Sequence, residues 1–129
     1  DREKLIQAVL NVARNGVQAM LQDSPKDEMN LNFITRAESQ IVFHKQKHTT
    51  AIRLDIVDNG PGIDKKLIDK IFYPLVSGKE SGSGLGLSLA QNFITQHNGM
   101  IDCFSTPGET KFSIILPIQN NLKINEVVK

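Results

Sequence analysis

The sequence predicts an α+β fold, a two-layer α/β sandwich in which a mixed β-sheet is covered on one face by about three helices. Residues 2–22 and 85–97 repeat apolar side chains every three or four positions, as amphipathic helices do. Residues 50–58 alternate apolar with polar side chains, as in a strand with one buried face. Because helices and strands do not alternate strictly, helices gathered on one face fit better than a doubly wound sheet.

The composition is that of one globular domain. The chain has 129 residues, of which 40% are hydrophobic and 22% charged, and its net charge is 15 − 14 = +1. This balance argues against disorder and gives no global signal for a nucleic-acid or membrane-surface binder. The single cysteine, Cys103, excludes an internal disulfide and a cysteine-built zinc site. No apolar run approaches the roughly 20 residues that span a bilayer.

The first predicted element is the helix over residues 2–22, which the sequence Asp23-Ser24-Pro25 ends. Its apolar face is expected to contain Ile6, Val9, Ala13, Val17, Met20 and Leu21.

The next elements are predicted as a hairpin, a third strand and a short helix. Residues 30–37 and 40–46 form the two hairpin strands, and residues 50–58 form the third strand. The turn sequence 59–62 ends that strand, and Asp64 is placed to cap a short helix that runs to Lys70.

The second half of the domain begins with a segment that lacks periodicity. We expect residues 72–83 to form a mobile loop that leads into the helix over 85–97. Gly99 stands where a C′ residue belongs. Strands over 100–104 and 110–116 complete the sheet.

Asp58 is the first candidate site residue. It is in phase with the apolar residues of its strand, so its carboxylate points toward the buried face, where it needs hydrogen-bond donors. The following Asn59-Gly60-Pro61-Gly62 lets a ligand approach the backbone. A ligand N–H group, such as an adenine amino group, would be a suitable donor. An aspartate that caps its own turn explains the same residues equally well.

Glycine placement is the second signal, because six of the nine glycines lie between positions 60 and 86. They are Gly60, Gly62, Gly78, Gly82, Gly84 and Gly86. The last three open a helix in the sequence Gly82-Ser83-Gly84-Leu85-Gly86-Leu87, where free N–H groups and the helix dipole favour a phosphate. Lys79 would add a positive charge. The simpler interpretation is a flexible linker, and neither a P-loop nor a dinucleotide-binding spacing is present.

Carboxamides on the first helix give a third signal. Asn11 and Asn15 are four residues apart, and Gln18 continues their stripe, which we expect to lie opposite the apolar face. A solvated stripe is the simpler interpretation. Carboxamide oxygens could alternatively bind a hard cation such as Mg²⁺, which takes few protein ligands.

Thr110 is the fourth signal. It opens the last strand in phase with Phe112 and Ile114, so its hydroxyl faces inward and needs a partner. A threonine chosen for its strand propensity explains the same residue.

In their order and spacing, these segments resemble the ATP-binding domain of sensor histidine kinases, over residues 1–118. The N, G1, F, G2 and G3 boxes of that family correspond in order to an Asn-bearing helix, 58–63, 72–74, 82–87 and 108–112. The resemblance implies a Bergerat-type ATP-binding fold shared with gyrase, Hsp90 and MutL. It also implies that residues 119–129 are a C-terminal tail outside the domain.

The resemblance further implies a site for ATP and Mg²⁺. Asn15 would coordinate Mg²⁺, Asn11 would support the phosphate side, and Asp58 would accept from the adenine amino group. Thr110 would lie near the adenine, and Ile63 against the base. Other positions implied to contact the nucleotide are Gln18, Gly60, Gly62, Lys79, Gly82, Gly84, Leu85, Gly86 and Leu87.

Two departures from the family pattern refine this expectation. Many such kinases have a lysine where this chain has Gln18. Lys79 would then supply the positive charge at the terminal phosphate. Only 18 residues (64–81) separate the two glycine boxes. This short segment, with Phe-Tyr-Pro-Leu-Val-Ser-Gly-Lys-Glu, resembles the nitrogen-regulation (NtrB) type of sensor kinase.

The implied activity is protein-histidine kinase rather than ATPase. The family's ATPases place a glutamate base where this chain has Asn11, which cannot take a proton. None of His44, His48 and His97 lies in an acceptor motif, and the chain begins at Asp1 rather than Met. We therefore expect an excised, monomeric, cytoplasmic catalytic domain. A nucleotide-binding module without catalysis is the alternative.

The resemblance also implies the partners. They would be the protein's own histidine-bearing dimerisation domain and, for the NtrB type, an NtrC-type response regulator and a P-II-type signal protein. We expect no nucleic-acid partner and no membrane contact by this domain.

Overall fold

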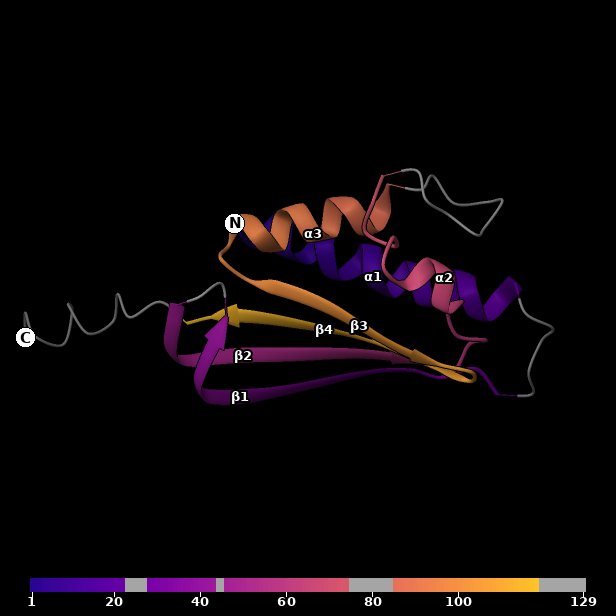
Figure 1. The fold of residues 1–129 in the computed structure, drawn as a ribbon, viewed down its shortest axis with the longest axis horizontal. Helices are drawn as coiled ribbons and strands as arrows, with labels where there is room; N and C mark the ends of the chain where they lie inside the picture. Colours follow the sequence, from indigo (N-terminus) through magenta and orange to yellow (C-terminus); the bar gives the residue numbers. More distant parts are fainter. Residues whose placement is uncertain (23–27, 44–45, 75–84, 119–129) are drawn as a thin grey trace, which may run out of the picture.

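A layer of helices lies on one face of a β-sheet (Figure 1). The structure, a computed structural model, describes residues 1–22, 28–43, 46–74 and 85–118. The helix layer contains α1 (Arg2–Gln22), α2 (Lys65–Ile68) and α3 (Gly86–Gln96). The sheet contains β1 (Leu31–Phe43), β2 (Gln46–Asp58), β3 (Met100–Thr106) and β4 (Glu109–Pro117). The predicted two-layer sandwich with about three helices on one face is confirmed.

The strand order is β1-β2-β4-β3, and all three neighbouring pairs are antiparallel. The sequence predicted a mixed sheet, and the described strands differ from it in having no parallel neighbours. The reason is that β2 and β3, which run in the same direction, have β4 between them. The helical crossover from β2 to β3 therefore joins strands that are not adjacent.

The prediction of a hairpin from residues 30–37 and 40–46 is wrong. Leu31–Phe43 is one continuous strand, and it pairs along its whole length with β2, from Leu31 opposite Asp58 to Phe43 opposite Gln46. Glu38 and Ser39, where the turn was expected, supply no glycine, proline or asparagine to reverse the chain. The predicted strand over 50–58 is the second part of β2.

The buried face of α1 also differs from the predicted one. The helix buries a stripe of small and mixed residues: Ala8, Asn11, Val12, Gly16 and Met20. Of the predicted apolar face, Ile6 is 48% and Leu21 62% exposed. Small residues let α1 approach the sheet and α3 closely, and a pattern weighted by hydrophobicity overlooks them. The carboxamide stripe consequently borders the buried face instead of lying opposite it.

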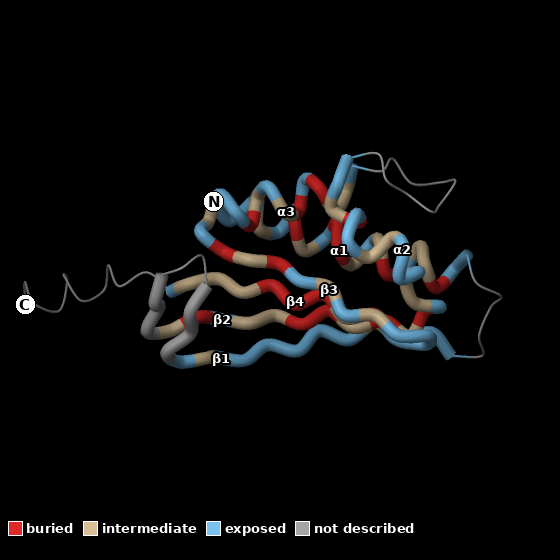
Figure 2. Tube along the Cα trace, in the orientation of Figure 1, coloured by how far each residue is buried: buried red, intermediate tan, exposed pale blue. Residues whose placement is uncertain are grey.

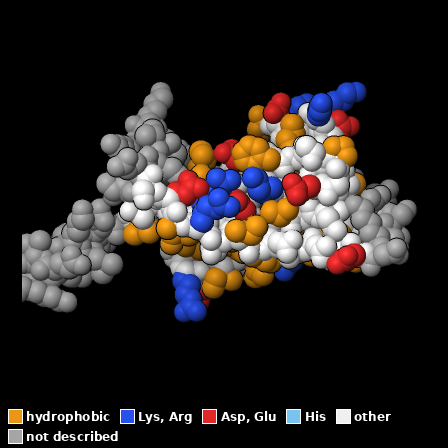
Figure 3. Space-filling view, turned by 90° about the horizontal axis from the view of Figure 1, so that it is seen from below, with side chains coloured by type: hydrophobic (Ala, Val, Ile, Leu, Met, Phe, Trp, Pro, Cys, Tyr) orange, Lys and Arg blue, Asp and Glu red, His pale blue; other side chains and the backbone are white. Residues whose placement is uncertain are grey.

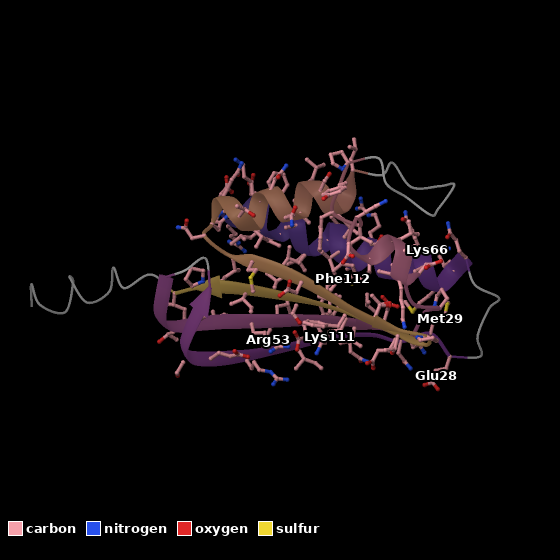
Figure 4. All side chains as sticks on the ribbon, in the orientation of Figure 1. Glu28, Met29, Arg53, Lys66, Lys111 and Phe112 are labelled. Atoms are coloured by element: carbon pink, nitrogen blue, oxygen red, sulfur yellow. The ribbon has the colours of Figure 1, made fainter. Side chains whose placement is uncertain are left out.

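The core lies between the two layers, where Figure 2 shows the buried segments of α1, α3, β2 and β4 facing one another. Phe112 of β4 is in its centre (Figure 4), 1% exposed, and the Phe72 ring meets it edge-on with centroids 6.2 Å apart. At one edge of the sheet, residues 31–39 of β1 are largely exposed beside this core.

The end of α3 corrects the predicted role of Gly99. Asn98, with φ 61°, is the left-handed residue after the helix, and its N–H donates to Thr95 O. Gly99 N–H donates to Ile94 O at 2.9 Å, which completes a Schellman motif whose C′ residue is Asn98, one residue earlier than predicted. Gly99 is required by space, because a Cβ there would lie 2.6 Å from Ile115 O.

The face of the sheet away from the helices carries a polar network (Figure 3). Asp55 is 3% exposed and accepts from Ser113 Oγ at 2.6 Å and from Arg53 Nε at 3.0 Å. Arg53 also donates to Glu38 at 3.3 Å. Burial by itself would raise the pKa of Asp55, but the Ser113 hydrogen bond and Arg53 outweigh it and hold the pKa below its usual value.

This network predicts a pH-dependent effect of Ser113→Ala. Because the pKa of Asp55 is lower in the folded state, its charge stabilises the fold. This stabilisation is complete above about pH 4, and it is lost as the pH falls through the pKa of Asp55 in the folded state. Ser113→Ala removes one cause of the lowering. The difference in free energy of unfolding between wild type and variant, from urea titrations, should be full at pH 6 and shrink in acid. A constant difference would exclude this role for the Asp55 charge.

Candidate functional site

Two buried polar residues meet where β2 ends and β4 begins. Asp58 and Thr110 lie directly opposite each other in the strand pair, and each is 3% exposed. They share the helix-facing side of the sheet with Ile56 and Phe112, as their phase predicted. A carboxylate and a hydroxyl therefore lie side by side at the end of the core. Ligand sites commonly place a few such polar groups to form hydrogen bonds with the ligand.

Backbone glycines surround the Asp58 carboxylate. Gly60 N–H donates to Oδ1 at 2.9 Å, so Asp58 does cap its own turn. Its Oδ2 faces α1, where a Cβ on Gly16 would lie 3.1 Å away. Sequence reasoning missed Gly16, although a glycine inside a helix costs about 1 kcal/mol relative to alanine and signals a close approach.

The loop after β2 is fixed against the end of β3. Gly62 has φ +90°, and a Cβ there would lie 2.6 Å from Thr106 O. Ile63 N–H donates to Ser105 Oγ at 2.8 Å, and the same oxygen lies 2.8 Å from Thr110 Oγ1. Ser105, also missed in the sequence, thereby joins the glycine loop to the buried threonine. Ser105 lies opposite Thr110 because β3 and β4 pair with each other, and the sequence alone does not show this pairing.

The start of α3 forms the other end of the site. Leu85 is the N-cap residue, and Gly86 and Leu87 begin the helix, where the first N–H groups have no partner within the helix. Asn11, 9% exposed, donates from Nδ2 to Gly86 O at 3.2 Å. Gln7 Nε2 donates to Asn11 Oδ1 at 3.0 Å. Asn11 therefore holds the α3 start in place.

Helix α1 connects the two ends. Asn11 touches Gly86, and a Cβ on Gly60 would lie 3.4 Å from Met20 Cγ, so one helix borders both glycine regions. The nine residue steps from Asn11 to Met20 correspond to about 13.5 Å along the helix axis, the scale of an extended nucleoside triphosphate. Asn15 and Gln18 are half-buried on this helix between the ends. The carboxamide oxygen of Asn15 fits Mg²⁺, a hard cation that prefers oxygen ligands.

Three predicted site residues lie outside the described part of the chain: Lys79, Gly82 and Gly84. Ile63 packs against the core cluster beside the loop, and Leu87 packs against the same core from α3. The structure thus brings together Asp58, Gly60, Gly62, Ile63 and Thr110 at one end, and Asn11 with Gly86 at the other.

Cys103 lies on the same sheet face, opposite Phe112. Burial raises the pKa of its thiol to about 12, and the charges of Asp58 and Asp102 add to the effect. The thiol therefore stays protonated at neutral pH and is a poor nucleophile. Within residues 1–22, 28–43, 46–74 and 85–118, His, Cys, Asp and Glu side chains form no group of three that could hold a metal ion.

Comparisons with known proteins identify the family and the fold of the chain. Residues 1–120 match the family described as histidine kinase-, DNA gyrase B-, and HSP90-like ATPase. The chain is 46% identical over 119 residues to the sensory histidine kinase/phosphatase NtrB of Salmonella typhimurium, covering 92% of this chain and 33% of that protein. It therefore spans about a third of the length of the curated relatives it matches.

Solved structures show the same fold. The mycobacterial sensor histidine kinase MprB matches with a TM-score of 0.72 and 25% identity, covering 91% of this chain and 74% of that chain. The catalytic domain of the histidine kinase ThkA matches with a TM-score of 0.71 and 24% identity, covering 91% and 68%. No helix in the described ranges is long and apolar enough to cross a membrane. The chain belongs to the family of histidine kinase-, DNA gyrase B- and HSP90-like ATPases.

Proposed function

We propose that residues 1–118 are the ATP-binding catalytic domain of a sensor histidine kinase of the nitrogen-regulation type. The domain would transfer the γ-phosphoryl group of Mg·ATP to a histidine on a separate dimerisation domain, for relay to a response regulator. The observation that carries the proposal is the two-ended site along α1. Asp58 and Thr110 lie buried at one end, and Asn11 holds the α3 N-terminus at the other. The 46% identity to NtrB supports the subfamily.

Each end of the site has its own part in binding ATP. Asp58 would accept a hydrogen bond from the adenine amino group, because its carboxylate is buried and already aligned by Gly60. The first N–H groups of α3, at Gly86 and Leu87, would bind phosphate oxygens. Asn15 would hold Mg²⁺, which would neutralise phosphate charge during transfer. Lys79 and the glycines 82 and 84 would complete the phosphate end.

The phosphate end favours transfer over hydrolysis. An ATPase needs a base that activates water, and Asn11 cannot accept a proton. Both polar atoms of its carboxamide are engaged, with Gln7 and with Gly86. The first turn of α3 carries no acidic residue either. Positioning and charge stabilisation would then carry the reaction to an imidazole nitrogen brought by the acceptor domain.

Phosphorylation with γ-labelled ATP tests the proposal. The full-length protein is expected to form phosphohistidine, which is stable to alkali and labile to acid, while the isolated 129-residue chain binds ATP but hydrolyses it very slowly. Asn15→Ala should remove Mg²⁺-dependent labelling, and Ser113→Ala on the far face serves as a folded control. ATP binding without any phosphohistidine would instead identify a regulatory nucleotide-binding module, and brisk hydrolysis by the isolated chain would contradict the kinase.

The partners follow from the proposed type. They would be the protein's own histidine-bearing dimerisation domain, an NtrC-type response regulator and a P-II-type signal protein, with the domain acting in the cytoplasm. The Salmonella relative is named as both a kinase and a phosphatase. We expect the isolated chain to be a monomer.

A further inference from the structure

We infer that Gln7 is a positioning residue of the phosphate end of the site, which consists of Asn11 and the first turn of α3. By donating a hydrogen bond to Asn11, Gln7 turns the Asn11 carboxamide so that its amide group meets the Gly86 carbonyl. The start of α3 is thereby held where its N–H groups bind phosphate. The inference rests on the proposed binding of ATP.

The orientation of the Asn11 carboxamide is fixed by a backbone atom. A carbonyl oxygen can only accept a hydrogen bond, and Asn11 contacts Gly86 O at 3.2 Å. The atom of Asn11 that faces Gly86 must therefore be the amide nitrogen, Nδ2, because two oxygens at this distance would repel each other. The chemistry of the partner thus decides which end of the carboxamide points toward α3.

The same reasoning gives the direction of the second hydrogen bond. With Nδ2 on Gly86, Asn11 turns Oδ1 toward the side chain of Gln7, 3.0 Å away. Oδ1 can only accept, so Gln7 must present its Nε2. The hydrogen bonds therefore run in one direction, from Gln7 to Asn11 and from Asn11 to Gly86. No other orientation of the two carboxamides satisfies both contacts.

The burial of the two side chains differs, and this separates their roles. Asn11 is 9% exposed, so water has little access to its oxygen if the Gln7 donor is lost. Gln7 is exposed and lies outside the core cluster. The two residues are one turn apart on α1, whereas Gly86 is 75 residues further along the chain than Asn11. Gln7 therefore acts on α3 through Asn11.

The start of α3 depends on such outside contacts. Its N-cap residue is Leu85, which makes no side-chain cap hydrogen bond. Leu89 N–H donates to Leu85 O at 2.9 Å and closes the first turn. The N–H groups of Gly86 and Leu87 come before this bond and have no partner within the helix. The hydrogen bond from Asn11 thus holds the turn whose N–H groups the proposed function assigns to phosphate.

Amide hydrogen exchange of the 129-residue chain without nucleotide tests the structural part. Gln7→Met removes the donor and keeps a side chain of similar length and helix propensity. The Leu89 amide should then exchange about fivefold faster, because the first turn of α3 opens more often. The Gly99 amide, which donates to Ile94 O at the other end of the helix, should change less than about twofold.

A double-mutant cycle tests whether Gln7 acts through Asn11. In an Asn11→Ala background, Gln7→Met should change the exchange of the Leu89 amide by less than about twofold, because the connection to Gly86 is already broken. A further acceleration of about fivefold in that background would overturn the inference.

Calorimetry with Mg·ATP tests the link to the nucleotide. Gln7→Met should bind ATP about fivefold more weakly than wild type. A glutamine that only stabilised α1 would lower the free energy of unfolding and leave the affinity unchanged. Gln96→Met is the matched control, since it changes an exposed glutamine at the far end of α3. It should leave the Leu89 exchange and the ATP affinity within about twofold of wild type.

Unchanged exchange of the Leu89 amide in Gln7→Met overturns the inference, and so does unchanged ATP affinity. Gln7→Ala gives the same comparison if Gln7→Met does not fold. ATP binding by wild type together with either result leaves the proposed function standing. Wild type that binds no nucleotide overturns the proposed function and the inference with it.

Discussion

Asp58→Ala is expected to abolish measurable ATP binding by the isolated chain. We call the end of the site that contains Asp58, Gly60, Gly62, Ile63 and Thr110 the base end. Asp58 supplies the only carboxylate among these residues, and a hydrogen bond to a charged acceptor contributes about 1.5–3 kcal/mol. Because Gly60 N–H also loses the carboxylate oxygen that accepts its hydrogen bond, we expect affinity to fall at least about 100-fold. Calorimetry with Mg·ATP measures the change.

The control for Asp58 is Asp102→Ala, which removes an exposed carboxylate from β3 on the opposite face of the sheet. It should leave ATP affinity unchanged. A second readout reports on the folded pocket itself, because the Asp58 charge contributes to the raised pKa of Cys103 after burial. Alkylation of Cys103 should therefore be faster in Asp58→Ala. Normal ATP affinity in this variant would mean that the base end is assigned to the wrong place.

Gly62→Ala is expected to damage both stability and nucleotide binding. A side chain at φ +90° is strained by about 1–2 kcal/mol, and the new Cβ would also lie 2.6 Å from Thr106 O, a backbone atom that cannot turn aside. Relief requires the loop to move away from β3, which breaks the Ile63–Ser105 hydrogen bond. We expect a loss of about 3 kcal/mol in the free energy of unfolding and at least a tenfold weaker ATP affinity.

Gly108→Ala is a matched control for Gly62→Ala. Gly108 has φ +91°, almost the same backbone strain, but nothing lies within 4 Å of a Cβ built there. It follows Pro107 in the turn between β3 and β4. The variant should lose about 1–2 kcal/mol of stability and keep its ATP affinity. If both variants lose the same stability and both still bind ATP, close contact with Thr106 has no part in forming the site.

The sequence predicted the inward direction of Asp58 and Thr110 better than it predicted the packing of the first helix. Side chains of a strand alternate strictly between its two faces. This alternation predicted that Asp58 and Thr110 point inward without information on the neighbouring strands. The buried face of α1 depends on what faces it. There a glycine and an asparagine are buried because Asp58 and Gly86 lie opposite them, and a scale of hydrophobicity assigns both to the surface.

Two other differences have the same origin. The turn between β1 and β2 was misplaced because the residues around Glu38 and Ser39 have no strong local preference for a strand or a turn. Their pairing with β2 keeps them in the strand. Ser105 was missed because its importance comes from Ile63 and Thr110, which are 42 and 5 residues away in the sequence. Local patterns identify a side chain's direction, whereas its partners come from the tertiary fold.

The polar pair Asp55–Ser113 keeps β2 and β4 from sliding along each other. It belongs to the same antiparallel ladder as Asp58–Thr110, three steps away on the opposite face. A slip of two residues would keep every side chain on its own face, so apolar burial resists it only weakly.

Such a slip, in one direction, would place Asp55 opposite Ile115 and Asp58 opposite Phe112. Both buried carboxylates would then lose their hydroxyl neighbours, which carries a desolvation penalty that apolar contacts do not offset. Asp55 and Ser113 thus fix the register of β2 and β4, and they hold Asp58 opposite Thr110 from the other face of the sheet.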